Sequence, residues 1–217
     1  TGLANPASAS AASYARYVEN MAAAGNEVYP LPMYVNFVAD LRPGEDIQVF
    51  LDEAPHLACV GADAYAETTA NFRRIMKRFR IGRNVSFVSE TSSDEYTATE
   101  KNLLIGLGEF GLIGLDLWAI DCPYGYGAWQ PDHKVSAPLF LADGTPAGRA
   151  PSIAEVFGLV DRANEITAQH LGTNAILPFL GEQGIGTASR RWPEGVVQIR
   201  FSPNGLGLLI QIGRAHV

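Results

Sequence analysis

Asn84-Val-Ser-Phe-Val-Ser-Glu-Thr91 runs as a short apolar strand directly into a carboxylate, Glu90. Its β-branched and aromatic residues lie between Gly82 and a Thr-Ser-Ser cluster, a pattern typical of a buried strand. A buried carboxylate is costly unless it is paired or faces an opening. We therefore predict that Glu90 lies where a buried strand emerges, at a candidate active site.

The pattern of a strand followed by a helix recurs on both sides of this stretch. We predict strands over 28–36, 57–65, 84–91 and 114–121, and helices over 10–25, 47–54, 67–79, 94–110 and 151–171. The predicted strands end at Asn36, Tyr65, Glu90 and Asp121. The unit therefore recurs roughly every 30 residues, the length of one strand-helix unit of an α/β protein.

Two α/β architectures fit this repeat: a small doubly wound sheet, and part of a (β/α)8 TIM barrel. A doubly wound nucleotide-binding sheet carries a glycine-rich phosphate turn after its first strand. The corresponding stretch here, Asn36-Phe-Val-Ala-Asp40, contains no glycine. We therefore predict a partial barrel over residues 1–172, and we expect the other strands of that barrel to precede it.

The pattern changes after this region. Short strand candidates over 175–179, 195–201 and 207–211 lie among glycines and prolines, so we predict the start of a C-terminal β-rich domain over 173–211. Residues 212–217, Ile-Gly-Arg-Ala-His-Val, match the translation of a sequencing adapter. We interpret them as an adapter-derived tail.

Composition excludes some partners. The 217 residues are 47% hydrophobic and 18% charged with a net charge of −7, which argues against nucleic acid and anionic membrane surfaces. No apolar run reaches the roughly 20 residues of a membrane span. Cys59 and Cys122 lie in apolar runs, where we expect structural thiols. The compartment stays undetermined, and a homo-oligomer remains open.

Barrel enzymes assemble their chemistry at the carboxyl ends of the strands. Here those ends carry Asn36, Asp63, Tyr65, Glu90, Trp118 and Asp121. They contain no metal-ligand cluster, and no histidine is placed for catalysis, so we predict neither a metal nor a cofactor. Aromatic rings that stack on sugars, with amide and carboxylate groups that bind hydroxyls, indicate a carbohydrate substrate.

Four segments carry a family resemblance: Pro30–Asn36, Gly61–Tyr65, Phe87–Thr91 and Gly114–Asp121. Together they resemble the later half of the barrel of bacterial-type β-galactosidases of glycoside hydrolase family 35. The likeness runs from about Tyr14 to Leu180. It implies barrel strands 5 to 8, a trailing β domain and a retaining enzyme that hydrolyses terminal β-D-galactosyl residues.

The resemblance also implies residue roles. Glu90, at the end of strand seven, would be the catalytic nucleophile, and Tyr65 would hydrogen-bond it. Trp118 and Asp121 would border the subsite for the cleaved sugar. We add Asn36, which ends strand five, and Asp63 as substrate-binding candidates. The acid/base glutamate of the family lies on strand four, so we expect it before Thr1.

The sequence departs from the family at two places: Ser89 stands where proline is frequent, and Trp118-Ala119 stands where Phe-Gly is frequent. Two other functions stay open. A non-catalytic carbohydrate-binding barrel would keep the same strand ends without the chemistry. A barrel lyase or aldolase would need a lysine at a strand end, whereas we place Lys77, Lys101 and Lys134 on helices or in a loop.

Overall fold

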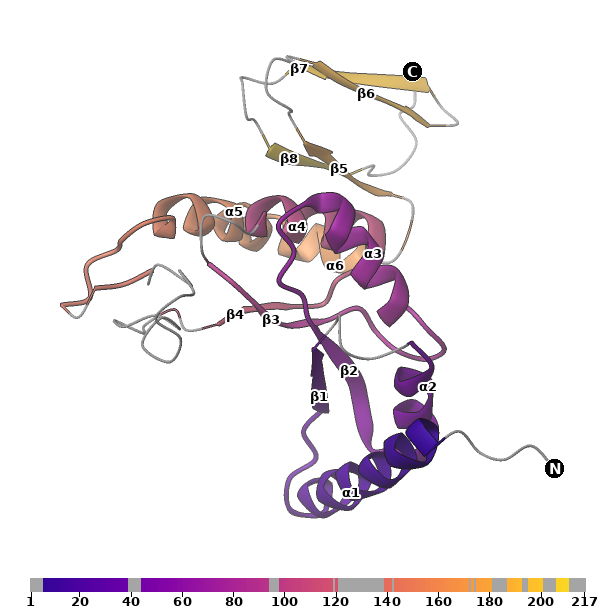
Figure 1. Cartoon of the computed structure of the whole chain (residues 1–217). Coiled ribbons are helices and arrows are strands. Elements are labelled where there is room, and N and C mark those ends of the chain that lie inside the picture. Colours follow the sequence, from indigo (N-terminus) through magenta and orange to yellow (C-terminus); the bar gives the residue numbers. More distant parts are fainter. Residues whose placement is uncertain are drawn as a thin grey trace.

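The computed structural model describes residues 6–38, 44–93, 98–118, 120, 139–141, 143–171, 173, 175–180, 187–192, 195–200 and 206–210. Figure 1 shows the arrangement of the elements. The helices are α1 (Pro6–Val28), α2 (Gly44–Glu53), α3 (Thr69–Phe79), α4 (Thr99–Ile105), the π-helix η1 (Gly106–Phe110), α5 (Ala150–Arg162) and α6 (Asn164–His170). The strands are β1 (Met33–Val38), β2 (Leu57–Asp63), β3 (Val88–Thr91), β4 (Leu115–Leu117), β5 (Ile176–Leu180), β6 (Thr187–Trp192), β7 (Gly195–Arg200) and β8 (Leu206–Ile210).

The strands β1 to β4 form one sheet in which each neighbouring pair is parallel, in the order β1-β2-β3-β4. Each strand therefore lies beside the strand that follows it along the chain. A doubly wound sheet reverses its strand order at a switch point. The described strands contain no such reversal. The predicted α/β class with a parallel sheet is confirmed.

The helices lie in a row along one face of this sheet. Each of α1 to α4 contacts the next helix in sequence, and both α2 and α3 pack on β2. In Figure 1 the row extends beside the strands from α1 at the bottom to α4 and α5 above. Right-handed crossovers between strands in sequential order place all connecting helices on the same face. Helices thus cover one face of the sheet.

Alternation along β1 distinguishes the two faces. Val35 and Phe37 pack into the core beneath the helices, whereas Tyr34, Asn36 and Val38 are exposed. Tyr34 and Val38 keep 49% and 48% of their surface accessible. A strand that alternates in this way has one buried and one open face. In the described part of the chain, the face away from the helices is therefore open along β1.

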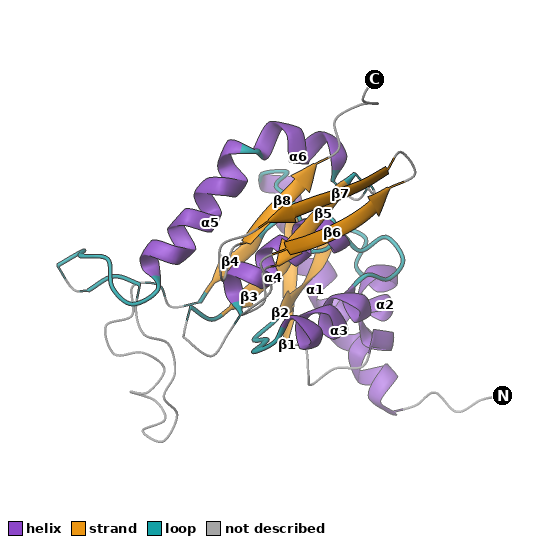
Figure 2. Cartoon of the chain, turned by 90° about the horizontal axis from the view of Figure 1, so that it is seen from above, coloured by secondary structure: helices purple, strands orange, loops and turns teal. Residues whose placement is uncertain are grey.

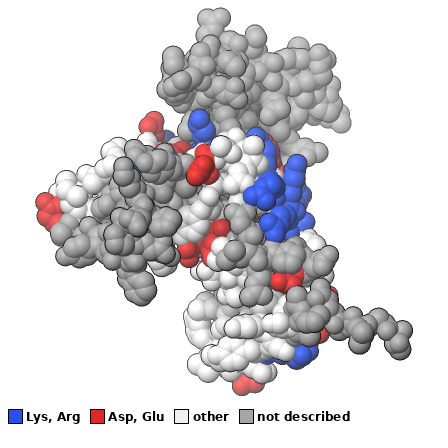
Figure 3. Space-filling view, viewed as in Figure 1, with Lys and Arg blue, Asp and Glu red and all other residues white. Residues whose placement is uncertain are grey.

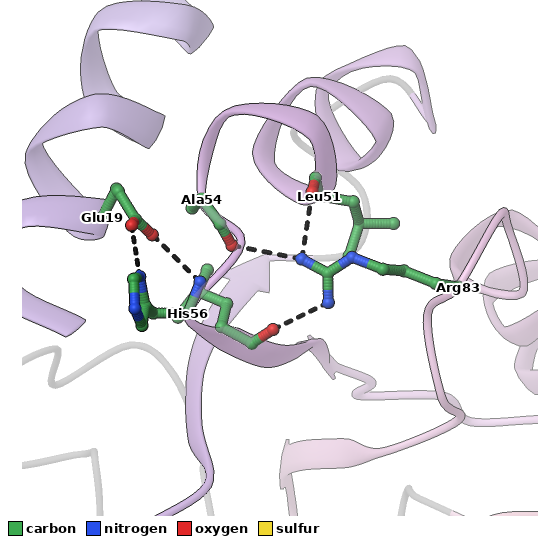
Figure 4. A network of polar contacts seen from close by, with 6 residues as sticks. Glu19, Leu51, Ala54, His56 and Arg83 are labelled. Carbon is green, nitrogen blue, oxygen red and sulfur yellow. Dashed lines mark hydrogen bonds and ion pairs between the residues drawn. The ribbon is translucent and has the colours of Figure 1, made fainter. Parts of the chain in front are cut away.

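A polar network ties α1 to the amino end of β2 (Figure 4). Glu19 of α1 accepts hydrogen bonds from the backbone N of His56, at 3.1 Å, and from its Nδ1, at 2.5 Å. Arg83 donates to three backbone carbonyls that flank the same loop, at 2.8 to 3.1 Å. Side chains from two distant segments therefore fix the turn that starts β2.

The strand β3 covers only the second half of the predicted strand 84–91, because a side chain replaces part of the strand pairing. Asn84 is buried, and its Oδ1 accepts from Val60 N at 2.8 Å. Its Nδ2 donates to Val60 O at 3.0 Å and to Phe79 O at 2.8 Å. The amide thus satisfies backbone groups of β2 that a longer β3 would otherwise pair with.

Two antiparallel pairs follow α6: β5 with β8, and β6 with β7. β5 packs against α4 and η1. In Figure 1 both pairs lie above the helices, on the side away from β3 and β4, and Figure 2 shows them from above. Strands were predicted over 175–179, 195–201 and 207–211. The structure adds β6, whose sequence Thr-Ala-Ser-Arg-Arg-Trp lacks an apolar alternation.

Candidate active site

The carboxyl ends of β1, β2 and β3 bring four of the predicted site residues together. Asn36 lies near the end of β1, and Asp63 ends β2 beside it. Glu90 of β3 is the register partner of Asp63, and Tyr65 follows two residues after β2. Parallel strands present their carboxyl ends at one edge of the sheet. These side chains therefore converge, although Asn36 and Glu90 are 54 positions apart in the sequence.

A β-bulge in β3 directs Glu90 toward this site. Along the pairing with β2, β3 advances two residues, from Val88 to Glu90, where β2 advances one. Regular alternation would place Glu90 on the same face as Val88, which is fully buried in the core under the helices. A bulge changes the direction of the side chains that follow it. As a result, the consecutive residues Ser89 and Glu90 both contact side chains from the carboxyl end of β2.

The hydroxyl of Tyr65 donates a hydrogen bond to Glu90 Oε1, as the family resemblance implies. Both side chains remain partly accessible, with 38% of Tyr65 exposed. Within the described residues Glu90 takes part in no ion pair. A neutral donor thus orients one oxygen of the carboxylate.

Asp63 joins three adjacent strands through its carboxylate. Asn36 Nδ2 donates to its two oxygens, at 3.2 and 3.1 Å, and Ser89 Oγ donates to Oδ1 at 3.2 Å. Asp63 is only 6% exposed. A carboxylate at this depth needs such donors, because they replace the hydrogen bonds that it loses to water.

Trp118 lies beside the end of β3. Its backbone N donates to Thr91 O at 2.7 Å, and its residue surface is 41% exposed. The fourth strand thus brings an accessible indole to the edge that carries Glu90. Asp121, and the aromatic residues Tyr124, Tyr126 and Trp129, lie outside the described residues.

The described part of the chain contains no group of three or more His, Cys, Asp or Glu side chains that could hold a metal ion. Cys59 is free and 4% exposed, and its burial raises the pKa of the thiol. A thiol in that state is a poor nucleophile.

Among the described residues, no helix has both the length and the hydropathy to cross a membrane.

Basic side chains gather on one side of the molecule, in the region of α3 (Figure 3). That helix and the turn after it carry Arg73, Arg74, Lys77, Arg78 and Arg80. Arg73 forms two hydrogen bonds with Glu109 of η1, at 2.7 and 2.6 Å. These charges lie on the helix layer, and at least one of them links neighbouring helices.

Sequence reasoning overlooked Ser89 and Asn84. Ser89 lies directly before the carboxylate, at the polar end of the run, and this position was a usable signal for a contact at the strand end. Asn84 opens the same run and was read as part of the strand. No periodicity predicts that its side chain pairs with β2.

No protein-family model matches the sequence, and no curated protein matches it closely enough to count as a relative.

Proposed function

We propose that β1 to β4 are strands 5 to 8 of a (β/α)8 barrel. Three observations support this: the sequential parallel order, the row of helices on one face, and the open opposite face along β1. In the described part of the chain β1 and β4, at the edges of this sheet, each pair with one strand only. Barrel closure removes such edges and makes the open face its interior. The strands β5 to β8 then begin the β-rich domain.

In this barrel the chain belongs to a retaining glycoside hydrolase that removes terminal β-D-galactosyl residues. The contact between Tyr65 and Glu90 supports the proposed reaction, and galactose as the sugar rests on the resemblance of the sequence to family 35. The contact places an oriented carboxylate at the edge of the sheet where barrel enzymes bind their substrates. The accessible ring of Trp118 and the amide of Asn36 complete a set of groups that suits a sugar.

Glu90 acts as the nucleophile. One carboxylate oxygen forms a bond to the anomeric carbon while the bond from that carbon to the leaving oxygen breaks. The hydrogen bond from Tyr65 occupies Oε1 and holds the carboxylate in one orientation, which leaves Oε2 for attack. Water then hydrolyses the glycosyl-enzyme, and the sugar leaves with its configuration retained.

A second carboxyl group protonates the leaving oxygen. In the resembled family this is a glutamate on strand four, in the half of the barrel that precedes β1. Retaining enzymes hold their two carboxyl groups about 5 to 5.5 Å apart. We therefore expect that glutamate to face Glu90 across the barrel mouth.

Replacement of the nucleophile tests the proposal in the protein that carries the complete barrel. Glu90→Ala should abolish hydrolysis of aryl β-D-galactosides, and added azide should partly restore turnover and yield the galactosyl azide of inverted configuration. Glu155→Ala is the matched control, because Glu155 is an exposed glutamate on α5, in the helix layer; it should keep normal rates. A Glu90→Ala enzyme with near-normal activity would contradict the assignment.

A non-catalytic carbohydrate-binding barrel is the second candidate, favoured by the exposed indole of Trp118 at the strand ends. Such a protein would bind galactosides without turnover. Its affinity would fall on Trp118→Ala and would not change on Glu90→Gln.

A further inference from the structure

We infer that Asp63 is a positioning residue that fixes the amide of Asn36 with its carbonyl oxygen toward the substrate, so that Asn36 accepts a hydrogen bond from a sugar hydroxyl. The inference rests on the proposed function for the identity of the substrate. It rests on geometry alone for the orientation of the amide.

The orientation follows from the chemistry of the two groups. A carboxylate only accepts hydrogen bonds, whereas a primary amide has a donor end and an acceptor end. Asn36 Nδ2 lies 3.2 and 3.1 Å from the two oxygens of Asp63. A flipped amide would bring Oδ1 against two carboxylate oxygens, which repel it. The donor end therefore faces Asp63.

Asn36 Oδ1 is then the end left for a ligand. The residue is exposed at the carboxyl end of β1, and within the described residues its only side-chain hydrogen bonds are those to Asp63. An acceptor held in this direction selects for a donor, and the donors of a sugar are its hydroxyl groups. Because the buried carboxylate of Asp63 holds the amide of Asn36 in one rotamer, the amide cannot turn to present its NH2 group to the ligand instead.

Asp63 also has a second donor, the hydroxyl of Ser89 at 3.2 Å. Ser89 immediately precedes Glu90 in the bulge of β3. Gly61 leaves the space for this contact, because a Cβ at that position would lie 2.5 Å from Ser89 Oγ. The carboxylate of Asp63 thus restrains two groups: the side chain of Asn36, which accepts from the sugar hydroxyl, and the strand β3, which carries Glu90.

Steady-state kinetics of the complete protein on p-nitrophenyl β-D-galactoside test the inference. Asp63→Asn puts an NH2 group in place of Oδ2, so the amide of Asn36 is no longer held with its oxygen outward, but the variant keeps an oxygen that accepts from Ser89. KM should therefore rise about 10-fold, the effect of one lost hydrogen bond. kcat should stay within about 2-fold, because the strand that carries Glu90 keeps its contact with residue 63. Asn36→Ala should do the same. Since Asp63 acts on KM through Asn36, the double variant should be no worse than Asn36→Ala alone.

A second variant keeps the test decisive if Asp63→Asn does not fold. Asn36→Leu keeps the approximate size of the side chain but has neither a donor for Asp63 nor an acceptor for a hydroxyl, so it should raise KM as much as Asn36→Ala. Wild-type kinetics for Asn36→Leu, or a double variant whose KM increase is the product of the two single increases, would overturn the inference. Substrates that lack single hydroxyls identify the partner: one of them should abolish the effect of both substitutions.

The side-chain amide signals of Asn36 in the 15N-labelled protein separate this inference from the proposed function. With Asp63 present, the two NH2 protons should be well dispersed and slow to exchange, and Asp63→Asn or Asn36→Leu should remove that signature or the signals themselves. A protein that hydrolyses no galactoside but shows this change refutes the function and supports the positioning. Turnover with Asn36 signals typical of a free amide refutes the positioning.

Discussion

The hydroxyl of Tyr65 donates a hydrogen bond to Glu90, although 25 residues separate the two side chains in the sequence. The contact depends on the bulge in β3, since an uninterrupted strand would turn Glu90 toward the same core as Val88. Strand pairing and one extra residue thus produce the arrangement on which the proposed chemistry depends.

Tyr65→Phe should lower kcat/KM for aryl β-D-galactosides by about 10- to 100-fold, because a hydrogen bond to a charged group contributes about 1.5 to 3 kcal/mol. The ring and its packing stay in place, so thermal stability should change little. Tyr14→Phe, at an exposed position on α1, is the control and should leave kinetics unchanged. Equal kinetics for the two variants would mean that Tyr65 does not orient the nucleophile.

Gly61→Ala should destabilise the fold by about 1 to 3 kcal/mol, as overpacking does in a filled interior. The added Cβ would lie 2.5 Å from Ser89 Oγ and 3.0 Å from Phe87 Cδ1. Urea denaturation measures the loss. Gly158→Ala in α5 is the matched control: its Cβ would lie 3.4 Å from Arg162 Nη1, and alanine favours a helix, so stability should rise by up to about 1 kcal/mol.

Asn84→Ala should cost about 3 kcal/mol of unfolding free energy, because it leaves buried backbone groups on Val60 and Phe79 without partners. Asn71→Ala removes an asparagine whose side chain bonds Arg74 on the surface of α3. That control should change stability by less than about 0.5 kcal/mol. Similar losses for both would show that Asn84 does not replace strand pairing.

Glu19 makes a pH-dependent contribution to stability. Burial raises the pKa of its carboxyl, but the hydrogen bonds from the side chain and backbone of His56 and the charges of His56 and Arg83 outweigh burial and lower it below 4.5. Because the pKa is lower in the folded state, the stabilisation is present above about pH 4.5 and disappears as pH falls through the folded pKa.

The corresponding variant is Glu19→Gln. It should lower Tm at pH 7 by on the order of 2 °C, and the difference from the wild type should vanish toward pH 3. Glu27→Gln, on an exposed residue near the end of the same helix, should show no such dependence. A Glu19→Gln deficit that persists at pH 3 would argue against the charge as its source.

The alternation of strands and helices was accessible from the sequence because apolar runs and amphipathic stretches recur at a regular spacing. The first and last residues of the helices and strands were harder to predict. Gly25 was read as the end of a helix, yet α1 continues to Val28. A Cβ at Gly25 would meet only the flexible end of the Met33 side chain, which can move aside. The glycine therefore does not end the helix, and the residues up to Val28 continue it.

Part of the site could be predicted from the sequence for a similar reason. Parallel strands that end in polar residues predict which side chains converge, and Asn36, Asp63, Tyr65 and Glu90 do converge. The bulge could not be predicted from the sequence, because it depends on how β3 pairs with both β2 and β4. The bond between Ser89 and Asp63 follows from the bulge and was missed with it.

Mass spectrometry of a trapped intermediate tests the role of Glu90 most directly. The complete protein would be incubated with 2,4-dinitrophenyl 2-deoxy-2-fluoro-β-D-galactoside, whose fluorine slows hydrolysis of the glycosyl-enzyme, and then digested. We predict a single fluorogalactosyl adduct on the peptide that contains Glu90, with the label on that side chain. An adduct on another carboxylate, or galactoside turnover with no adduct and inverted product, would contradict Glu90 as the nucleophile.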